Sequence, residues 1–421
     1  MRTGPLALAG LAVAAALPAT AAAEWSAPVR LSPVDRASYA SPAVGSGPGS
    51  SAAAAWIRTP AGAPRGAGRV QLAARPPGGG WSRARTLSGP GAASPWVALN
   101  ARGDAVAAWT NGRRIVGAVR RGPRGAWTPG RVVDAGAPVQ GLVVSLDVRG
   151  RPTAAWIERG GGRGFQVRIA TGDAKGARWS VRPARVATPG PEPPVLALSP
   201  GKGALAAWVD DERVLAARTV GGTFERPVEL SDPEAASPGV ALGGSGSALL
   251  SWSVRLPGGS RVLQAAGRPA TAPRWGAAED IGIGGTPVVA VNAVGDAVVA
   301  WGIGQPGRAQ AVEATTRRRG GLWRASTIVA PHECDCLLSA AQAAVDGDGR
   351  AVVSWRREGG AGGGSGGAAA LAPGGNDWQP ARLPSRGVTA PPAVAAAPTA
   401  GVATAWAVGG PGGGVRALQN R

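Results

Sequence analysis

Apolar residues along this chain form short strand-like segments that recur about every fifty residues. In the stretch 81–126 the segments are WSRARTLS, PWVALN, AVAAWT and IVGAVRR. The segments between them, GPGAAS, ARGD and NGRR, hold the glycine, asparagine and aspartate typical of turns. One repeat therefore predicts four short antiparallel strands joined by tight turns.

Tryptophan marks two positions of the repeat, and each position occurs eight times. The first closes an alanine-rich strand at spacings of 44 to 54 residues, and the second opens a strand with the pattern W-[ST]-x-P-x-x-[LV]. Self-similarity at a period of this length indicates a repeat architecture. The closing residues are Trp56, Trp109, Trp156, Trp208, Trp252, Trp301, Trp355 and Trp406. The opening residues are Trp25, Trp81, Trp127, Trp179, Phe224, Trp275, Trp323 and Trp378.

The two strand types belong at different places in a sheet. Alternation puts Ala105, Ala107 and Trp109 on one face of AVAAW and Val106 and Ala108 on the other. Both faces are apolar, so we expect this strand to be internal. The strand opened by tryptophan carries a proline in several copies, and proline lacks the N–H that a central strand donates, so this strand is expected at an edge. These prolines are Pro28, Pro129, Pro183, Pro227 and Pro380.

The two ends of the chain complement each other. EWSAPVRLS near the start is an edge strand without inner partners, whereas AVAAA, VATAWAV and GVRALQ at the end are three inner strands without an edge strand. We therefore predict an all-β fold: an eight-bladed β-propeller of four-stranded antiparallel blades, closed by the N-terminal edge strand joining the C-terminal three. A linear solenoid or two four-bladed halves would leave both ends unpaired, and no composition shift marks a linker between halves.

Residues 1–23 have the order of a secretory signal peptide. Arg2 precedes an apolar run from Leu6 to Leu17, and small residues lead to Ala23. The run is too short to span a bilayer, so we expect no transmembrane segment. Residues 24–421 are then one exported propeller domain, which we expect to be monomeric and extracytoplasmic.

The chain is strongly basic, with 45 Lys and Arg against 25 Asp and Glu and a formal charge of +20. Such a charge can attract nucleic acid, an anionic envelope polymer or an acidic polysaccharide. The arginines are dispersed without a dense run, which favours a compositional origin. We expect no nucleic-acid partner and leave a glycan or an envelope polymer as the candidate partners.

Glycine-rich segments running into tryptophan suggest a family. RPPGGGW, RGPRGAW, RRRGGLW and APGGNDW end at Trp81, Trp127, Trp323 and Trp378, and in this the chain resembles the bacterial sialidase-type or BNR-repeat β-propellers. The resemblance implies a propeller and a glycan ligand. The aspartate box S-x-D-x-G-x-T-W is missing, and Tyr39, the only tyrosine, has no matching motif. No catalytic residue is carried over from the family.

Polar residues follow the closing tryptophans and also occupy the loops on the same rim of the propeller. Loops over a rigid scaffold commonly hold binding sites, so this rim is the expected binding surface, although a merely solvated rim would show the same pattern. The candidate binding residues are Tyr39, Arg58, Glu158, Asp210, Asp211, Arg255, Arg356 and Glu358.

The segment PHECDCLL contains the only histidine and the only two cysteines. Outside the cell, Cys334 and Cys336 favour a disulfide, although one intervening residue would make it strained. Zinc held by His332, Cys334 and Cys336 is a weaker alternative because C-x-C departs from the usual spacing, and free thiols are a third. We expect no cofactor.

Two turns contain sequences that resemble an adhesion motif or a calcium-binding loop. Arg102-Gly103-Asp104 is an adhesive tripeptide, yet the glycine and aspartate recur in the same turn at Asp296 and therefore indicate turn chemistry. Asp346 and Asp348 could hold calcium, but the run of oxygen ligands and the distal glutamate of a calcium loop are absent.

No convincing nucleophile, metal cluster or phosphate loop emerges from the sequence. We therefore expect a non-catalytic binding or scaffolding module at the cell surface or outside the cell. The alternative is a sialidase-like propeller that binds or hydrolyses glycans with rim carboxylates and arginines, since two catalytic carboxylates from different blades leave no sequence spacing to detect.

Overall fold

The computed structural model describes residues 25–129, 133–160, 164–173, 178–188, 192–305, 308–330, 337–358, 365–381, 387–388, 391–397, 401–408 and 413–420. These residues form β-strands and one short 3₁₀ turn, η1 (Pro48–Ser50). Within these ranges no helix is long and apolar enough to cross a membrane.

The strands make eight antiparallel sheets, which we number as blades by the chain order of their innermost strands. Blade 1 contains β2 (Ser38–Ser46), β3 (Ala52–Thr59), β4 (Arg69–Arg75) and β5 (Arg85–Thr86). Blade 2 contains β6 (Ala92–Leu99), β7 (Ala105–Asn111), β8 (Arg114–Arg120), β9 (Trp127–Pro129) and β10 (Val133–Asp134). Blade 3 contains β11 (Val139–Leu146), β12 (Pro152–Arg159), β13 (Phe165–Gly172) and β14 (Trp179–Thr188). Blade 4 contains β15 (Val195–Ser199), β16 (Gly203–Asp210), β17 (Arg213–Val220), β18 (Thr223–Phe224) and β19 (Val228–Glu229).

The second half of the ring follows the same plan. Blade 5 contains β20 (Ala235–Leu242), β21 (Ala248–Arg255), β22 (Arg261–Arg268) and β23 (Glu279–Ile283). Blade 6 contains β24 (Val288–Val291), β25 (Ala297–Gln305), β26 (Arg308–Arg317) and β27 (Thr327–Ala330). Blade 7 contains β28 (Leu337–Val345), β29 (Ala351–Glu358), β30 (Ser365–Leu371) and β31 (Trp378–Pro380). Blade 8 contains β32 (Ala393–Ala396), β33 (Val402–Val408), β34 (Gly414–Asn420) and β1 (Val29–Arg30).

The predicted strand order is confirmed. In every blade the alanine-rich strand lies second from the axis, and the strand with tryptophan and proline lies at the outer edge. Two blades differ from the simple plan, because their outer strand is divided into β9 and β10 or into β18 and β19. In blade 4 the break falls at Pro227, which has no N–H to donate.

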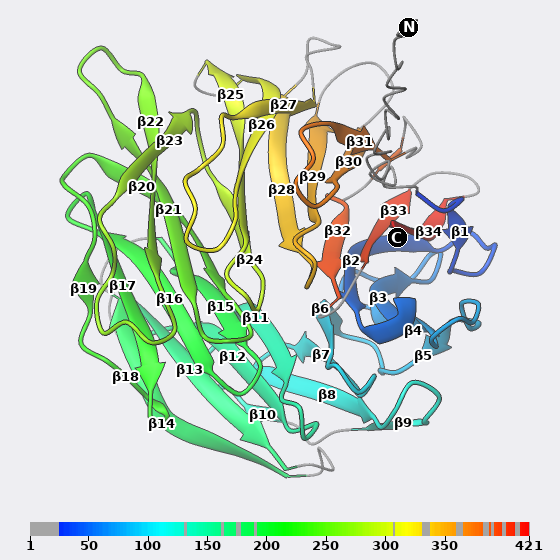
Figure 1. The fold of residues 1–421 in the computed structure, drawn as a ribbon. Coiled ribbons are helices and arrows are strands. Elements are labelled where there is room, and N and C mark those ends of the chain that lie inside the picture. The colour runs from blue at the N-terminus through cyan, green and yellow to red at the C-terminus, as the bar shows by residue number, and fades with distance from the viewer. Residues whose placement is uncertain are drawn as a thin grey trace, which may run out of the picture.

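Pairing between the two ends of the chain completes blade 8, as predicted. Val29 pairs with Ala417 and Arg30 with Arg416. Next to this short ladder, the N–H of Leu31 donates to the carbonyl of Val415 at 2.8 Å. Figure 1 shows β1 in blue beside β34 and β33 in red. The predicted closure by the N-terminal edge strand is therefore confirmed.

The blades form a closed ring rather than a line. The innermost strands contact one another in the order β2, β6, β11, β15, β20, β24, β28 and β32, and β32 contacts β2 again. An apolar cluster fills each of the eight junctions between neighbouring blades. The eight closing tryptophans lie in or beside these clusters and are at most 6% exposed, whereas the eight opening aromatic residues are half-buried at the outer edge.

The two rims of the ring carry different connections. One rim, here called the turn rim, holds the turns between the first and second strands of the blades, such as 292–296. The other, called the loop rim, holds the connections between blades, such as 230–234. On the turn rim, Asn292 Nδ2 donates to the carbonyl of Asp346 in the next blade at 2.7 Å. Arg318 Nη1 lies 2.8 Å from Asp296 Oδ2 and also donates to the carbonyl of Asp348. These polar contacts tie blade 6 to blade 7.

Gly349 lies beneath this ion pair with a φ of +87°, and a Cβ there would overlap the Arg318 guanidinium and Asp296. Gly320 has a similar φ of +67°, but nothing lies within 4 Å of its Cβ position. Both Gly→Ala variants carry the cost of a left-handed residue. We expect Gly349→Ala to lose about 1 kcal/mol more unfolding free energy than Gly320→Ala, because only it displaces Arg318. Urea denaturation of the two variants measures this difference, and equal losses would contradict it.

Candidate functional site

Tyr39 lies inside β2 and is only 3% exposed, with its ring in the cluster between blades 8 and 1. Its hydroxyl donates to Asp35 Oδ1 at 2.7 Å. The other oxygen of Asp35 accepts from Arg58 Nη2 at 2.7 Å and from Nε at 3.0 Å. Tyr39 and Arg58, both predicted as rim residues, are thus brought together by Asp35, which the sequence analysis did not single out. The geometry is that of a structural anchor for the loop 31–37.

The electrostatics of this anchor oppose a nucleophilic tyrosine. Burial and then the hydrogen bond to Asp35 raise the pKa of Tyr39 above its usual 10.0. Burial would raise the pKa of Asp35, but the hydrogen bonds from Tyr39 and Arg58 outweigh it and leave the pKa below the usual 3.8. Tyr39 therefore stays protonated at neutral pH and donates to an ionised carboxylate.

Glu158 is also buried, with 3% of its surface exposed. Its Oε1 accepts from Arg168 Nη1 at 2.9 Å, and its Oε2 accepts from the N–H of Gly136 at 3.0 Å. These contacts link β12 to β13 and to the connection before β11. Glu158 therefore has a structural role in blade 3.

The remaining candidates in blade 7 and in the cysteine-containing segment are less informative. Arg356 is half-buried near the end of β29. Glu358 ends the same strand, and its side chain lies outside the described residues. His332, Cys334 and Cys336 also lie outside the described residues, so the disulfide, zinc and free-thiol hypotheses stay predictions.

The aspartates of the turns are buried, and their carboxylates accept hydrogen bonds from neighbouring groups. Asp104 is 6% exposed and accepts from Asn100 Nδ2 and from the N–H of Gly122, so its carboxylate is not displayed for adhesion. Asp346 is fully buried and accepts from the N–H groups of Arg350 and Gly401. The turn chemistry predicted for these positions is confirmed.

Three of the predicted residues do converge, on the loop rim at blades 4 and 5. Asp210, Asp211 and Arg255 line one pocket of about 510 Å³. Its walls come from the β16–β17 hairpin, the starts of β20 and β22, the end of β21, and the connection before β15. The other charged residues that line it are Glu192, Glu212, Glu234 and Arg261. We call this the acidic pocket.

The backbone of the acidic pocket is unusual. Asp211 and Glu212 form the two-residue turn between β16 and β17 with φ values of 48° and 59°. Glu234 has a φ of 68°. Such turns normally use asparagine and glycine, because a side chain at positive φ is strained. Asp211, Glu212 and Glu234 thus all have positive φ, a conformation that aspartate tolerates and glutamate adopts less readily.

Most carboxylates of the acidic pocket have no arginine partner among the described residues. Ten arginine–carboxylate pairs occur in the part of the chain that the structure describes. In the pocket only Glu234 has such a partner, Arg255, at 4.0 Å. Within the same described ranges, no ion pair or side-chain hydrogen bond involves the carboxylates of Glu192, Asp210, Asp211 or Glu212. Five carboxylates against two guanidinium groups give the lining a formal charge of −3.

This arrangement favours a cationic group in the pocket. Carboxylates that repel one another are stabilised by a positive charge placed among them. In the described part of the chain no three His, Cys, Asp or Glu side chains are close enough to hold a metal ion together. The arrangement therefore suits a larger cation, such as an ammonium or guanidinium group, better than a bare metal ion.

The sequence analysis missed Glu192, Glu212, Glu234 and Arg261. Glu212 could have been found, because it continues the run Asp210-Asp211 at the tip of a predicted hairpin. The others lie on separate connections up to about fifty residues away, and only the ring brings them together. No local spacing would have revealed them.

Among known proteins, the chain is similar to solved structures only. No protein-family model matches the sequence, and no curated protein matches it. A protein of unknown function from Dyadobacter fermentans is 12% identical, with 95% of this chain and 98% of that chain covered and a TM-score of 0.43. A PL25 ulvan lyase is 12% identical over 76% and 90% of the two chains, with a TM-score of 0.47. The β-propeller domain of the Trilobed protease from Pyrococcus furiosus is 9% identical over 79% and 95%, with a TM-score of 0.45.

Titration of the single tyrosine tests the anchor directly. We expect the tyrosinate absorbance of Tyr39 to appear with a midpoint above pH 10.0, and the midpoint to fall in Asp35→Asn because the carboxylate that raises the pKa is gone. Since the folded pKa is raised, stability should fall as the pH rises from the unfolded value through the folded one. A midpoint at or below 10.0 in the native protein would contradict the buried hydrogen bond.

Proposed function

We propose that this chain is an exported, non-catalytic β-propeller binding module, and that its acidic pocket binds a ligand bearing an ammonium or guanidinium group. The observation that carries the proposal is the gathering of four carboxylates without arginine partners in a chain of net charge +20. Export rests on the predicted signal peptide, residues 1–23.

The size and chemistry of the pocket support a specific ligand. A volume of about 510 Å³ is within the range of ligand pockets and accommodates a basic side chain with part of its backbone, or an amino sugar. Arg255 and Arg261 border the carboxylates, so anions and neutral hydroxyl groups of the same ligand also find partners. The turn Asp211-Glu212 is fixed by the β16–β17 ladder, which holds the carboxylates in position before binding.

The basic surface elsewhere makes the pocket selective. A net positive protein repels cations in general, so attraction must come from the local field of the carboxylates. Anionic polymers are attracted to the arginines outside the pocket instead. Attachment to an anionic envelope polymer is therefore compatible with binding of a cationic ligand, because the two would use different surfaces.

Calorimetric titration with hexalysine tests the proposal. We expect Asp211→Asn to weaken binding about fivefold, the loss of one exposed ion pair. Asp134→Asn is the matched control, because Asp134 is exposed and lies in blade 2. Absence of hexalysine binding to the native protein, or equal weakening in both variants, would refute the proposed site.

A glycan-active enzyme is the second candidate, and the carboxylates of one pocket favour it. Glycoside hydrolysis needs one carboxylic acid and one carboxylate facing the scissile bond. The net negative lining disfavours a sialic acid, whose carboxylate would be repelled. A catalytic version of this site would therefore act on a neutral or amino sugar.

Assays with a panel of aryl glycosides separate the two candidates. We expect no turnover by the native protein. If turnover occurs, its loss in Asp210→Asn with an unchanged melting temperature would establish the enzyme and overturn the non-catalytic proposal. Glu158→Gln serves as the structural comparison, because it disrupts the buried pair with Arg168 and should cost about 1–3 kcal/mol of stability.

A further inference from the structure

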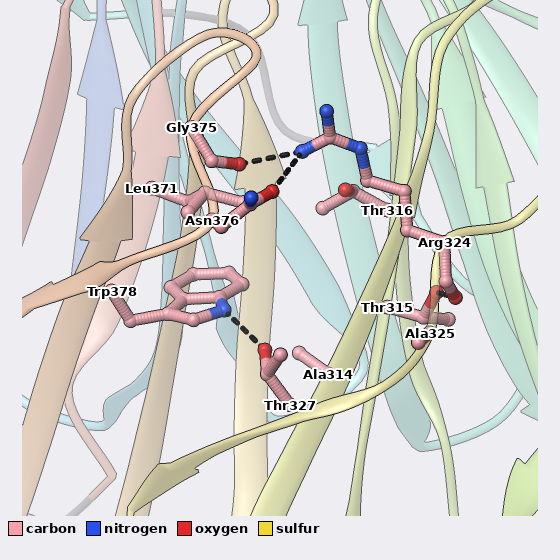
Figure 2. Close-up of a pocket in the computed structure, with 10 residues that line it drawn as sticks. All are labelled: Ala314, Thr315, Thr316, Arg324, Ala325, Thr327, Leu371, Gly375, Asn376 and Trp378. Atoms are coloured by element: carbon pink, nitrogen blue, oxygen red, sulfur yellow. Dashed lines mark hydrogen bonds between the residues drawn. The ribbon is translucent and has the colours of Figure 1, made fainter.

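A second pocket, of about 460 Å³, lies between the outer strands of blades 6 and 7 (Figure 2). It is separate from the acidic pocket, with which it shares no lining residue. No carboxylate lines it. The lining residues are Ala314, Thr315, Thr316, Arg324, Ala325, Thr327, Leu371, Gly375, Asn376 and Trp378. We call it the arginine–tryptophan groove.

Arg324 is held in place without a counter-ion. Its Nη1 donates to the carbonyl of Gly375 at 2.5 Å and to Asn376 Oδ1 at 3.1 Å, and its Nη2 donates to the carbonyl of Gly374 at 3.3 Å. All three acceptors are neutral oxygens of the β30–β31 hairpin. A guanidinium has five N–H donors, so two remain for a further acceptor once these three bonds are made. The group is thus ordered before binding and keeps its full charge.

Trp378 provides the apolar side of the groove. Figure 2 shows its indole ring across the pocket from the Arg324 side chain. The indole Nε1 donates to Thr327 Oγ1 at 3.0 Å, which fixes the ring, and the side chain is half-buried. A fixed aromatic face beside threonine hydroxyls and an amide is suited to a flat, hydroxylated ring with an apolar face.

These polar groups do not come from the repeat. Blades 2 and 6 can be matched at two points here, because Arg120 and Arg317 each end a third strand and each lie over the next tryptophan, Trp127 and Trp323. At the positions of Thr316 and Arg324, blade 2 has Val119 and Thr128. The groove in blade 6 has therefore acquired a cation and a hydroxyl that blade architecture does not require.

A small second cavity adjoins the groove on the side of the turn rim. It shares Thr316, Arg324 and Leu371 with the groove and adds Arg317 and Arg318. One carboxylate, Asp296, lines it and is paired with Arg318. Arg317 is in turn paired with Glu279, so Arg324 is the one of these three arginines without a carboxylate partner in the described part of the chain.

We propose that the arginine–tryptophan groove binds an acidic oligosaccharide, with a sugar ring stacked on Trp378 and its carboxylate or sulfate on Arg324. Charge complementarity selects this occupant, because the groove combines an uncompensated guanidinium with an aromatic face and hydroxyl-bonding groups. A purely apolar ligand would leave Arg324 without an anionic partner, and a cation would be repelled.

Binding of three oligosaccharides, measured by calorimetry, tests the proposal. The probes are an oligogalacturonate, its neutral methyl ester, and a sulfated galactan oligomer. We expect binding of at least one acidic probe and none of the methyl ester, and the stronger acidic probe identifies the carboxylate or the sulfate as the recognised group. Equal binding of the ester, or no binding of any probe, would overturn the proposal.

Variants locate the site. Arg324→Gln should weaken binding of the acidic probe about tenfold, the loss of a charge-assisted hydrogen bond. Arg274→Gln is the matched control, because Arg274 is exposed and precedes Trp275 as a loop residue of blade 5. Equal weakening by both would show attraction to net charge alone.

Trp378→Phe keeps an aromatic ring should Trp378→Ala fail to fold, and it should weaken binding less than Arg324→Gln does. Asp211→Asn should leave this binding unchanged, so failure here is distinguishable from failure of the acidic pocket.

Discussion

Pairing of β1 with β34 is the interaction on which the rest of the structure depends. The second strand of each blade is apolar on both faces, so every blade needs a neighbour on each side. Seven junctions arise from chain order alone, but the junction of blade 8 with blade 1 requires the two ends of the chain to meet. The ladder at Val29 and the hydrogen bond from Leu31 to Val415 join the two ends of the chain, so every blade has a neighbour on each side.

Two pairs of blades that lie four positions apart in the ring share further contacts. In blades 1 and 5 the closing tryptophan donates to a glutamine of the next strand, as Trp56 does to Gln71 and Trp252 to Gln264. Blades 2 and 6 share the stacked arginine, and each also places an arginine against the aspartate of its turn. Blades 1 and 2 therefore resemble blades 5 and 6 in these contacts, and the arginine–tryptophan groove lies where the resemblance of blade 6 to blade 2 fails. Arg324 has no counterpart in blade 2, and this departure cannot be ascribed to packing common to the repeat.

The fold was predictable from the sequence because its determinants are local and repeated. Each closing tryptophan and each edge-strand proline indicates the position of its own strand in the blade, and the unequal ends of the chain indicate how the ring closes. The binding surface was predictable only in part. Asp210, Asp211 and Arg255 follow strand ends on the expected rim, whereas Glu234 and Arg261 join them only through the packing of separate hairpins.

No sequence pattern could predict which side chains form hydrogen bonds or ion pairs with each other. Tyr39 and Glu158 look like rim residues because they lie near strand ends, yet Asp35 and Arg168 bury them in hydrogen bonds. Ten carboxylates in the described part of the chain are paired with an arginine, so proximity to a strand end does not by itself make a carboxylate available to a ligand. Within the same part, the acidic pocket gathers carboxylates without arginine partners, and the groove holds an arginine without a carboxylate, so each presents to a ligand a local charge of one sign on a rigid ring.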